Sequence, residues 1–96
     1  MKLIKVVKST NLKKKYDALF KDKDGKEKKI SFGASGYGDY TITKNKEQRE
    51  RYRKRHEKDL KTNDPTRAGY LSRFLLWGDS TNLKKNIQDY KKKFKL

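Results

Sequence analysis

The first third of the chain alternates apolar and polar positions in the manner of β-strands. Residues 3–7 are short and rich in β-branched side chains, which is typical of a strand. Two further alternating runs, residues 16–20 and 30–32, lie on either side of the dipeptide at 24–25, Asp-Gly. The pattern therefore predicts one short strand followed by a β-hairpin.

The register of this hairpin can be predicted from its side chains. Pairing Phe20 with Ile30 sets two apolar residues opposite each other and places Asp22 against Lys28. A shift of one residue would set Phe20 against Lys29 and break the apolar face. We therefore expect the pairing of Phe20 with Ile30.

A glycine-rich segment, residues 33–38, follows the hairpin. Its three glycines permit tight or left-handed backbone. Residues 40–43 have the composition of one more short strand. Asn45 then predicts a helix start, because Asn is a favoured N-cap and Gln48 stands at the capping-box position.

The segment 46–60 reads as a highly charged helix. At 100° per residue, Tyr52, His56 and Leu60 share one face. The opposite face carries a stripe of cations, which consists of Arg51, Lys54, Arg55 and Lys58. The spacing also predicts the helical ion pairs Glu47–Arg51 and Glu50–Lys54.

Two more helices are predicted towards the C-terminus. Asp64-Pro65 is a start signal with Pro at the first helical position, and Gly78 ends the apolar run that follows. Asp79 or Ser80 is the expected cap of the last helix. That helix has an amphipathic stripe formed by Leu83, Ile87, Tyr90 and Phe94.

The expected fold class is α+β: a small antiparallel sheet of about three strands, with one hairpin, followed by three helices. We expect a single basic domain over residues 1–96, with strands and the glycine-rich loop in 1–43 and helices in 44–96. The expected core consists of Phe20, Ile30, Phe32, Tyr40, Phe74, Trp77, Ile87 and Phe94.

The large excess of positive charge bears on function more than on fold. The formal net charge is +16, and 42% of the residues are charged. The excess lies in three blocks, at residues 1–29, 44–61 and 84–95, and spares the aromatic-rich segments between them. A small domain needs a net charge of only about 2–8 for solubility, so the excess indicates a polyanionic partner.

We expect this partner to be nucleic acid, bound through phosphates, without sequence preference and with strong dependence on salt. Acidic protein surfaces are the alternative partner. The predicted nucleic-acid-binding residues are Arg49, Arg51, Lys54, Arg55, Lys58, Tyr37, Lys84, Lys91 and Lys95. Tyr37 is included because it stands in a flexible loop, where it could stack on a base.

No catalytic residue, metal ligand or cofactor is predicted, so we expect a protein that is not an enzyme. His56, the only histidine, is expected to be a half-buried helix residue hydrogen-bonded to a neighbour. A metal-dependent nuclease is a weaker hypothesis, with Asp39 as the acid to test. The glycine-rich loop lacks the P-loop ending and is expected to be a tight connection between strands, or less readily a contact for one phosphate.

The chain has no Cys, no recognisable signal peptide and no apolar run of the ~20 residues that cross a bilayer. These features predict no transmembrane segment and a reducing, cytosol-like compartment.

Three ordered blocks carry a family resemblance: residues 29–41, 51–56 and 68–77. They resemble a family of small, basic, largely uncharacterised proteins encoded by large nucleocytoplasmic DNA viruses and some phages. The chain departs from it where an acid-plus-Trp pair is expected, at residues 59–61, and where a Pro is expected, at 79–80.

The resemblance implies a viral protein located in the virion, the host cytoplasm or the virus factory. It supplies no catalytic residues. With the charge pattern, it leaves three hypotheses open: a nucleic-acid-binding protein, a minor capsid protein that docks on acidic protein or membrane surfaces, and a metal-dependent nuclease.

Overall fold

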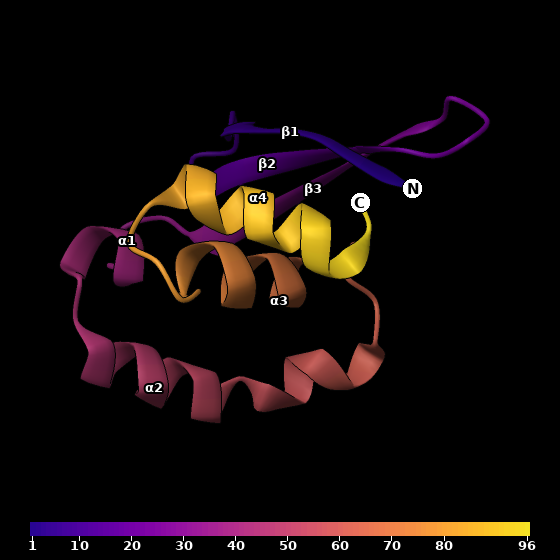
Figure 1. The fold of residues 1–96 in the computed structure, drawn as a ribbon. Coiled ribbons are helices and arrows are strands. Elements are labelled where there is room, and N and C mark those ends of the chain that lie inside the picture. Colours follow the sequence, from indigo (N-terminus) through magenta and orange to yellow (C-terminus); the bar gives the residue numbers. More distant parts are fainter.

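A computed structural model describes all residues, 1–96, and confirms the predicted α+β class. Three antiparallel strands come first: β1 (Lys2–Lys8), β2 (Lys14–Lys21) and β3 (Glu27–Ala34). The helical half follows, as Figure 1 shows. Its elements are α1 (Tyr40–Thr43), α2 (Lys46–Arg55), the 3-10 helix η1 (Glu57–Thr62), α3 (Ala68–Leu71), the π-helix η2 (Ser72–Leu76) and α4 (Leu83–Phe94).

The strand order is β1-β2-β3, but the predicted register of the hairpin was wrong by two residues. Ala18, not Phe20, lies opposite Ile30. The cause is the turn: Asp22 and Lys26 close a three-residue loop through the bond from Asp22 N to Lys26 O, 2.9 Å. Gly25 occupies the left-handed position of that loop, with φ 84°. A shift of two leaves every side chain on its predicted face.

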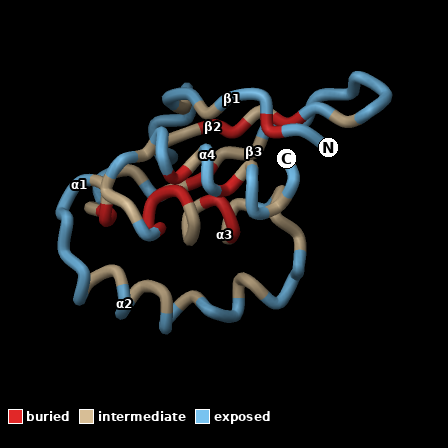
Figure 2. The backbone as a smooth tube through the Cα atoms, viewed as in Figure 1, coloured by how far each residue is buried: buried red, intermediate tan, exposed pale blue.

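One face of the sheet carries the core. Leu3, Ala18, Phe20 and Phe32 are buried there against α3, η2 and α4, and Figure 2 shows the buried segments gathered between these layers. The helical half contributes the other seven buried apolar residues, which are Tyr40, Tyr70, Leu71, Leu75, Leu76, Trp77 and Tyr90. α2 has no buried residue and lies on the far side of α3 from the sheet.

Four of the predicted core residues are buried, namely Phe20, Phe32, Tyr40 and Trp77. The other four, Ile30, Phe74, Ile87 and Phe94, are half-buried and pack on the outside of the cluster. The radius of gyration is 12.8 Å, close to the ~13 Å of a folded domain of about 100 residues.

Several element boundaries differ from the predicted ones because polar side chains cap the backbone elsewhere. Residues 40–43 form a helical turn, not a strand, because Asp39 caps them by accepting from Thr41 N at 2.8 Å. The charged helix remains α-helical only to Arg55, and a 3-10 helix continues it.

The second and third helices also begin later than predicted. Asp64 accepts a bond from Thr66 N at 2.9 Å, so Pro65 lies in a turn and α3 begins at Ala68. Asn82, not Asp79 or Ser80, caps α4, because the backbone of Ser80 is already bonded to the buried amide of Asn86. No helix of the chain is long and apolar enough to span a membrane.

Candidate nucleic-acid interface

The outward side of α2 carries cations that have no acidic partner. Arg51, Lys54 and Arg55 are exposed, and none of them makes an ion pair. The predicted helical pairs do not form: Glu50 turns from Lys54 to Arg49 at 3.0 Å and Arg53 at 3.4 Å, and Glu47 makes no ion pair. The predicted N-cap is confirmed: Asn45 accepts from Gln48 N at 3.0 Å. This cap sets where α2 begins.

The inward side of α2 carries two arginines that bind the protein itself. Arg53 donates from Nε to Trp77 O at 3.0 Å and from Nη2 to Asp79 at 3.1 Å. Arg49 donates to Gly78 O at 3.3 Å and lies over the ring of Tyr40, 4.6 Å from its centroid. Arg49 was predicted to contact nucleic acid, but these bonds give its guanidinium a structural role.

An aromatic stack continues this attachment of α2 to the body. The ring of Tyr52 lies 4.5 Å from that of Trp77 on one side and 4.3 Å from that of His56 on the other. His56 is half-buried, with Nδ1 3.3 Å from a carboxylate oxygen of Asp59, as the sequence predicted. Burial raises the pKa of the Tyr52 hydroxyl above its ordinary value.

The glycine-rich loop runs from the end of β3 to α1, and so connects a strand to a helix, not to the strand that was predicted. Ser35 donates its hydroxyl to Leu12 O at 2.6 Å, so this group is already used inside the protein. Gly33 has φ 78°, and a Cβ there would lie 2.7 Å from a methyl group of Leu76. The loop therefore packs directly on η2.

Asp39, the acid considered for a nuclease, is buried and fully bonded. One oxygen accepts from Lys15 Nζ at 2.6 Å, and the other accepts from the backbone N and the hydroxyl of Thr41. No group of three or more His, Cys, Asp or Glu side chains is arranged to hold a metal ion. The contacts of Asp39 are those of a helix cap.

A pocket of about 450 Å³ lies between the glycine-rich loop, α2 and η2. We call it the loop–helix pocket. Tyr37, Lys14 and Arg55 are exposed residues that line it, whereas Trp77 contributes from the core and His56 from the aromatic stack. Tyr37 and Arg55 were predicted site residues, and the structure brings them together here.

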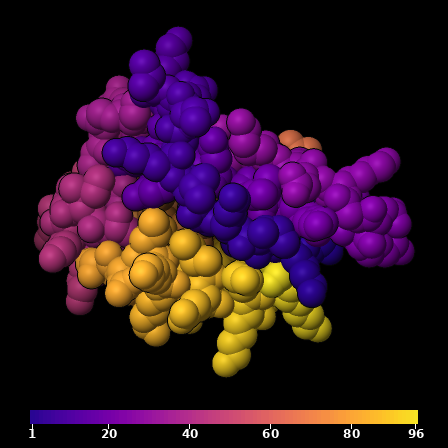
Figure 3. All heavy atoms as spheres, turned by 90° about the horizontal axis from the view of Figure 1, so that it is seen from above, coloured from indigo at the N-terminus to yellow at the C-terminus, as the bar shows by residue number.

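The remaining predicted residues are dispersed. Lys58 is exposed in η1, Lys84 and Lys95 are exposed at the two ends of α4, and Lys91 is half-buried. α2 and α4 lie on different sides of α3 (Figure 1), so the α4 lysines do not continue the stripe of α2. In the view from above, Figure 3, α4 runs beside the N-terminal strand.

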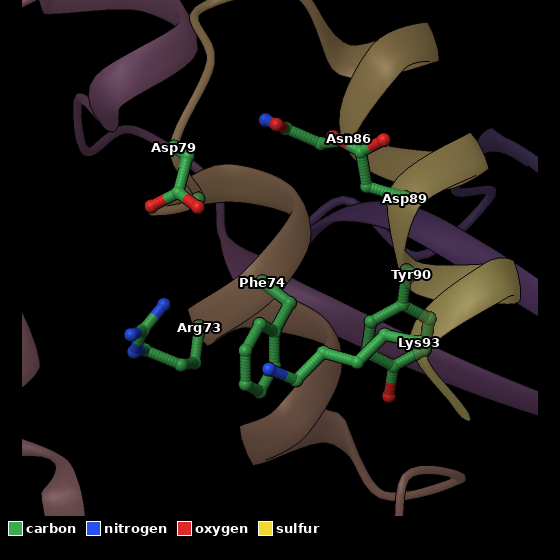
Figure 4. A pocket seen from close by; sticks show the side chains of 8 residues that line it. Arg73, Phe74, Asp79, Asn86, Asp89, Tyr90 and Lys93 are labelled. Atoms are coloured by element: carbon green, nitrogen blue, oxygen red, sulfur yellow. The ribbon is translucent and has the colours of Figure 1, made fainter.

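A second, smaller pocket of about 150 Å³ lies beside α4 (Figure 4). Arg73 and Lys93 both approach the ring of Phe74 there, at 4.7 and 5.5 Å from its centroid. Burial lowers the pKa of Arg73, and this side chain makes no ion pair. Asp79 and Asp89 line the same pocket, which makes it mixed in charge.

Sequence reasoning did not find Lys14, Trp77 or Arg73 as site residues. Trp77 lies in an apolar run and was assigned to the core, where its exposed fraction of 7% indeed places it. A single Arg within the apolar segment 70–77 was the only signal for Arg73.

The chain was compared with protein families, curated proteins and solved structures. No curated protein and no solved structure shows significant similarity to it. A family model matches residues 4–56, which is more than half of the chain and runs from β1 through α2. The matched part contains nearly all of the sheet, the glycine-rich loop and the exposed cations Arg51, Lys54 and Arg55 of α2. The chain therefore belongs to the family of unknown function DUF5754.

Proposed function

We propose that this protein is a non-enzymatic nucleic-acid-binding protein that contacts phosphates without regard to sequence. The observation that carries the proposal is the set of free cations on α2 and on η1, the 3-10 helix that continues it. Arg51, Lys54 and Lys58 are exposed and have no ion-pair partner, although acidic residues are available on the same segment. Glu50 is used by the inward arginines instead, and the exposed Glu47 makes no ion pair, so the outward face carries an excess of positive charge.

The attachment of α2 supports the same function. Two arginine contacts and an aromatic stack hold the helix on the body, so its outward cations are presented on a fixed element. A fixed row of cations suits a polymer with regularly spaced charges, because little side-chain order is lost on binding. Lys and Arg that contact only phosphates position the protein but do not read bases.

The resemblance to viral proteins also supports a proposal about where the protein acts. Within it, the protein acts in the virion or the virus factory, where it neutralises or packages viral nucleic acid. A formal net charge of +16 on 96 residues fits that task, since bound cations release the counterions of the phosphates.

The test is a titration of a labelled random-sequence duplex over a range of salt concentrations, beside an acidic polypeptide of similar charge. We expect the affinity for DNA to exceed that for the polypeptide, and the logarithm of the binding constant for DNA to fall linearly with the logarithm of salt concentration. The magnitude of the slope of this logarithmic plot should decrease by about 0.9 for each phosphate contact removed. The key variant carries Arg51→Glu, Lys54→Glu and Lys58→Glu, and should lose most of the binding.

A matched variant separates a local effect from net charge. Lys5, Lys23 and Lys26 are exposed on the sheet and its hairpin, and reversing them changes the net charge by the same amount. We expect that variant to retain clearly more binding than the α2 variant. Equal losses in both would overturn the assignment to α2. No preference for DNA over the polypeptide would overturn the function.

A second candidate function is docking on an acidic viral structural protein. Its support is the exposed apolar side chains of Ile4 and Val7 on the edge strand β1 and of Leu12 in the turn that follows it, which is 91% exposed. Exposed apolar residues on a strand edge suit a protein contact. Tighter binding to the acidic polypeptide than to DNA would favour this candidate.

A further inference from the structure

We propose that the loop–helix pocket binds one unstacked nucleobase of a single strand, with the adjoining phosphate at its mouth. This inference rests on the proposed function and deepens it, since it assigns a preference for single-stranded over duplex nucleic acid. It comes from the lining of the pocket and not from the charge of the whole protein.

The volume of the pocket suits a small aromatic ligand. At about 450 Å³ it falls within the range of roughly 300–1,000 Å³ that is usual for small-molecule sites. Phe32, Leu76 and Trp77 belong to its lining and to the buried core, so one side of the pocket is apolar. A flat aromatic ring can therefore be buried against this side, because no charged group of the protein has to be desolvated there.

Polar groups occur on the helix side of the pocket. His56 and Asp59, which are paired at 3.3 Å, supply a ring nitrogen and carboxylate oxygens, and both side chains are about 40% exposed. Gln48 accepts from the Thr43 hydroxyl through Oε1, and its amide nitrogen donates to no protein group. Base edges carry both donors and acceptors, so this lining can meet either kind.

The mouth is cationic and aromatic. Lys14 and Arg55 are exposed there and have no ion-pair partner, so a phosphate linked to the bound base would meet two free positive charges. Tyr37 is 73% exposed, and its ring packs on no other aromatic ring. An exposed tyrosine beside free cations is the combination that sequence-tolerant single-strand binding uses.

The pocket is preformed because its two sides are held by internal contacts. Arg53 ties α2 to Trp77 O, and the ring of Tyr52 lies between Trp77 and His56. On the other side, the close approach of Gly33 to Leu76 sets the position of the glycine-rich loop. A preformed site keeps down the conformational entropy lost on binding.

A base in a duplex is paired and stacked, so it must first be extruded before it can enter the pocket. In a single strand the bases are already unpaired, so most of the free energy of extrusion is not required. The pocket thus predicts tighter binding of a single strand than of a duplex with the same number of phosphates, at a salt concentration where both are measurable.

Trp77 provides the readout, because it is the only tryptophan of the chain and it lines the pocket. The experiment titrates the protein with a short oligothymidylate, with an abasic oligonucleotide of the same length and with a duplex. We expect oligothymidylate to change the fluorescence of Trp77 at saturation. The abasic strand should bind through its phosphates but leave the fluorescence nearly unchanged.

Two variants test the mouth of the pocket. Tyr37→Ala should weaken the single strand by about fivefold or more, as expected for the loss of one stacking contact, and Tyr37→Phe should restore most of it. Lys14→Ala should weaken the single strand more than Lys13→Ala, which removes an exposed lysine outside the pocket. Duplex affinity should change little in the Tyr37 variants.

The outcomes separate the pocket from the function. If both strands change the fluorescence alike and Tyr37→Ala has no effect, the pocket inference is wrong while phosphate binding stands. If no nucleic acid binds better than the acidic polypeptide, the proposed function fails and the inference fails with it. A fluorescence change caused by the acidic polypeptide would assign the pocket to a peptide instead, which also overturns the inference.

Discussion

The indole of Trp77 lies flat against the phenol ring of Tyr52, with centroids 4.5 Å apart and planes inclined by 9°. Trp77 belongs to the core at the end of η2, whereas Tyr52 stands in the middle of α2, an element with no buried residue. Together with the bonds of Arg49 and Arg53, this contact joins the basic helix to the folded body. It also forms part of the lining of the loop–helix pocket.

Tyr52→Ala should loosen α2 and lower the free energy of unfolding by about 2 kcal/mol, less than the 3–5 kcal/mol usual for a fully buried aromatic ring. The loss combines apolar burial with the stacking on Trp77. Urea unfolding, monitored by far-UV circular dichroism, measures this change in the free energy of unfolding. Arg51→Ala, one residue away on the exposed face, should change stability by no more than about 0.5 kcal/mol.

Arg53→Lys should be destabilising although it keeps the charge. The guanidinium of Arg53 donates to Trp77 O, Asp79 and Glu50 at once, and a lysine ammonium cannot reproduce this planar fork. We expect a loss of about 1–2 kcal/mol, since bonds from charged donors contribute about 1.5–3 kcal/mol. Lys54→Arg on the exposed face is the matched exchange, and it should leave the urea midpoint unchanged.

The buried amide of Asn86 is the polar centre of the turn before α4. It donates to Leu75 O at 3.0 Å and to Ser80 O at 2.8 Å, and accepts from Ser80 N at 3.2 Å. Asn86→Asp has the same shape but loses both donated bonds and leaves a charge in a site that is 3% exposed. We expect a loss of about 3 kcal/mol at neutral pH. Thermal unfolding would check it.

The stability of Asn86→Asp should depend on pH in a way that the parent does not show. A buried carboxylic acid is less costly when it is protonated, so the variant should recover stability as the pH is lowered towards 4. An equal loss at pH 4 and pH 7 would show that the donated bonds alone matter.

The free energy of unfolding at acidic pH should depend on Asp17 on β2. Hydroxyl groups of Ser31 and Ser9 donate to this carboxylate at 2.6 and 2.7 Å, and they hold its pKa below the ordinary value, with help from Lys29. The folded state therefore binds this proton less readily than the unfolded state. The resulting stabilisation is complete above about pH 4 and is lost as the pH falls through the lowered pKa of the folded state.

Asp17→Asn should flatten this part of the acid profile, measured as the urea midpoint between pH 2 and 5. Asp24 is a suitable control, since it is exposed in the hairpin turn and its side chain accepts no hydrogen bond. Asp24→Asn should leave the profile of the parent in place. A parallel shift of the whole curve in Asp17→Asn, with its slope unchanged, would contradict the linkage to this proton.

The sequence predicted what depends on local periodicity. The alternating strands and the exposed cations at 51, 54 and 55 follow from repeats of two or 3.6 residues, and the structure has them. The cap at Asn45 follows from the local preference of Asn for that position, and it is also present. Details of turns were harder to predict. The hairpin register depended on a loop with Gly25 at its left-handed position, and the helical turn at Tyr40 depended on the acceptor bonds of Asp39.

The pocket could not be predicted because its lining comes from segments far apart in the chain. Tyr37 lies about twenty residues from Lys14 and about twenty from Arg55 along the chain. Only the path of the glycine-rich loop and the attachment of α2 bring the three residues together. Likewise, periodicity places Arg49 and Arg53 on a charged helix but does not say that their guanidinium groups bind Gly78 O and Trp77 O.

The glycines of the loop allow a comparison in which backbone strain and packing can be separated. Gly33 and Gly36 both have a left-handed backbone, with φ values of 78° and 85°. A Cβ on Gly36 would meet nothing within 4 Å, whereas a Cβ on Gly33 would lie 2.7 Å from Leu76. Gly36→Ala should therefore cost only the backbone strain of about 1 kcal/mol.

Gly33→Ala should cost about 2–4 kcal/mol, because overpacking against Leu76 adds about 1–3 kcal/mol to the same strain. Urea unfolding of the two variants measures the difference directly. Leu76→Ala in the Gly33→Ala background tests the cause: if the methyl clash is responsible, the second substitution should cost less there than in the parent. Additive losses would instead show that Leu76 is not the cause, and would assign the cost of Gly33→Ala to the backbone and to the neighbouring Lys15 side chain.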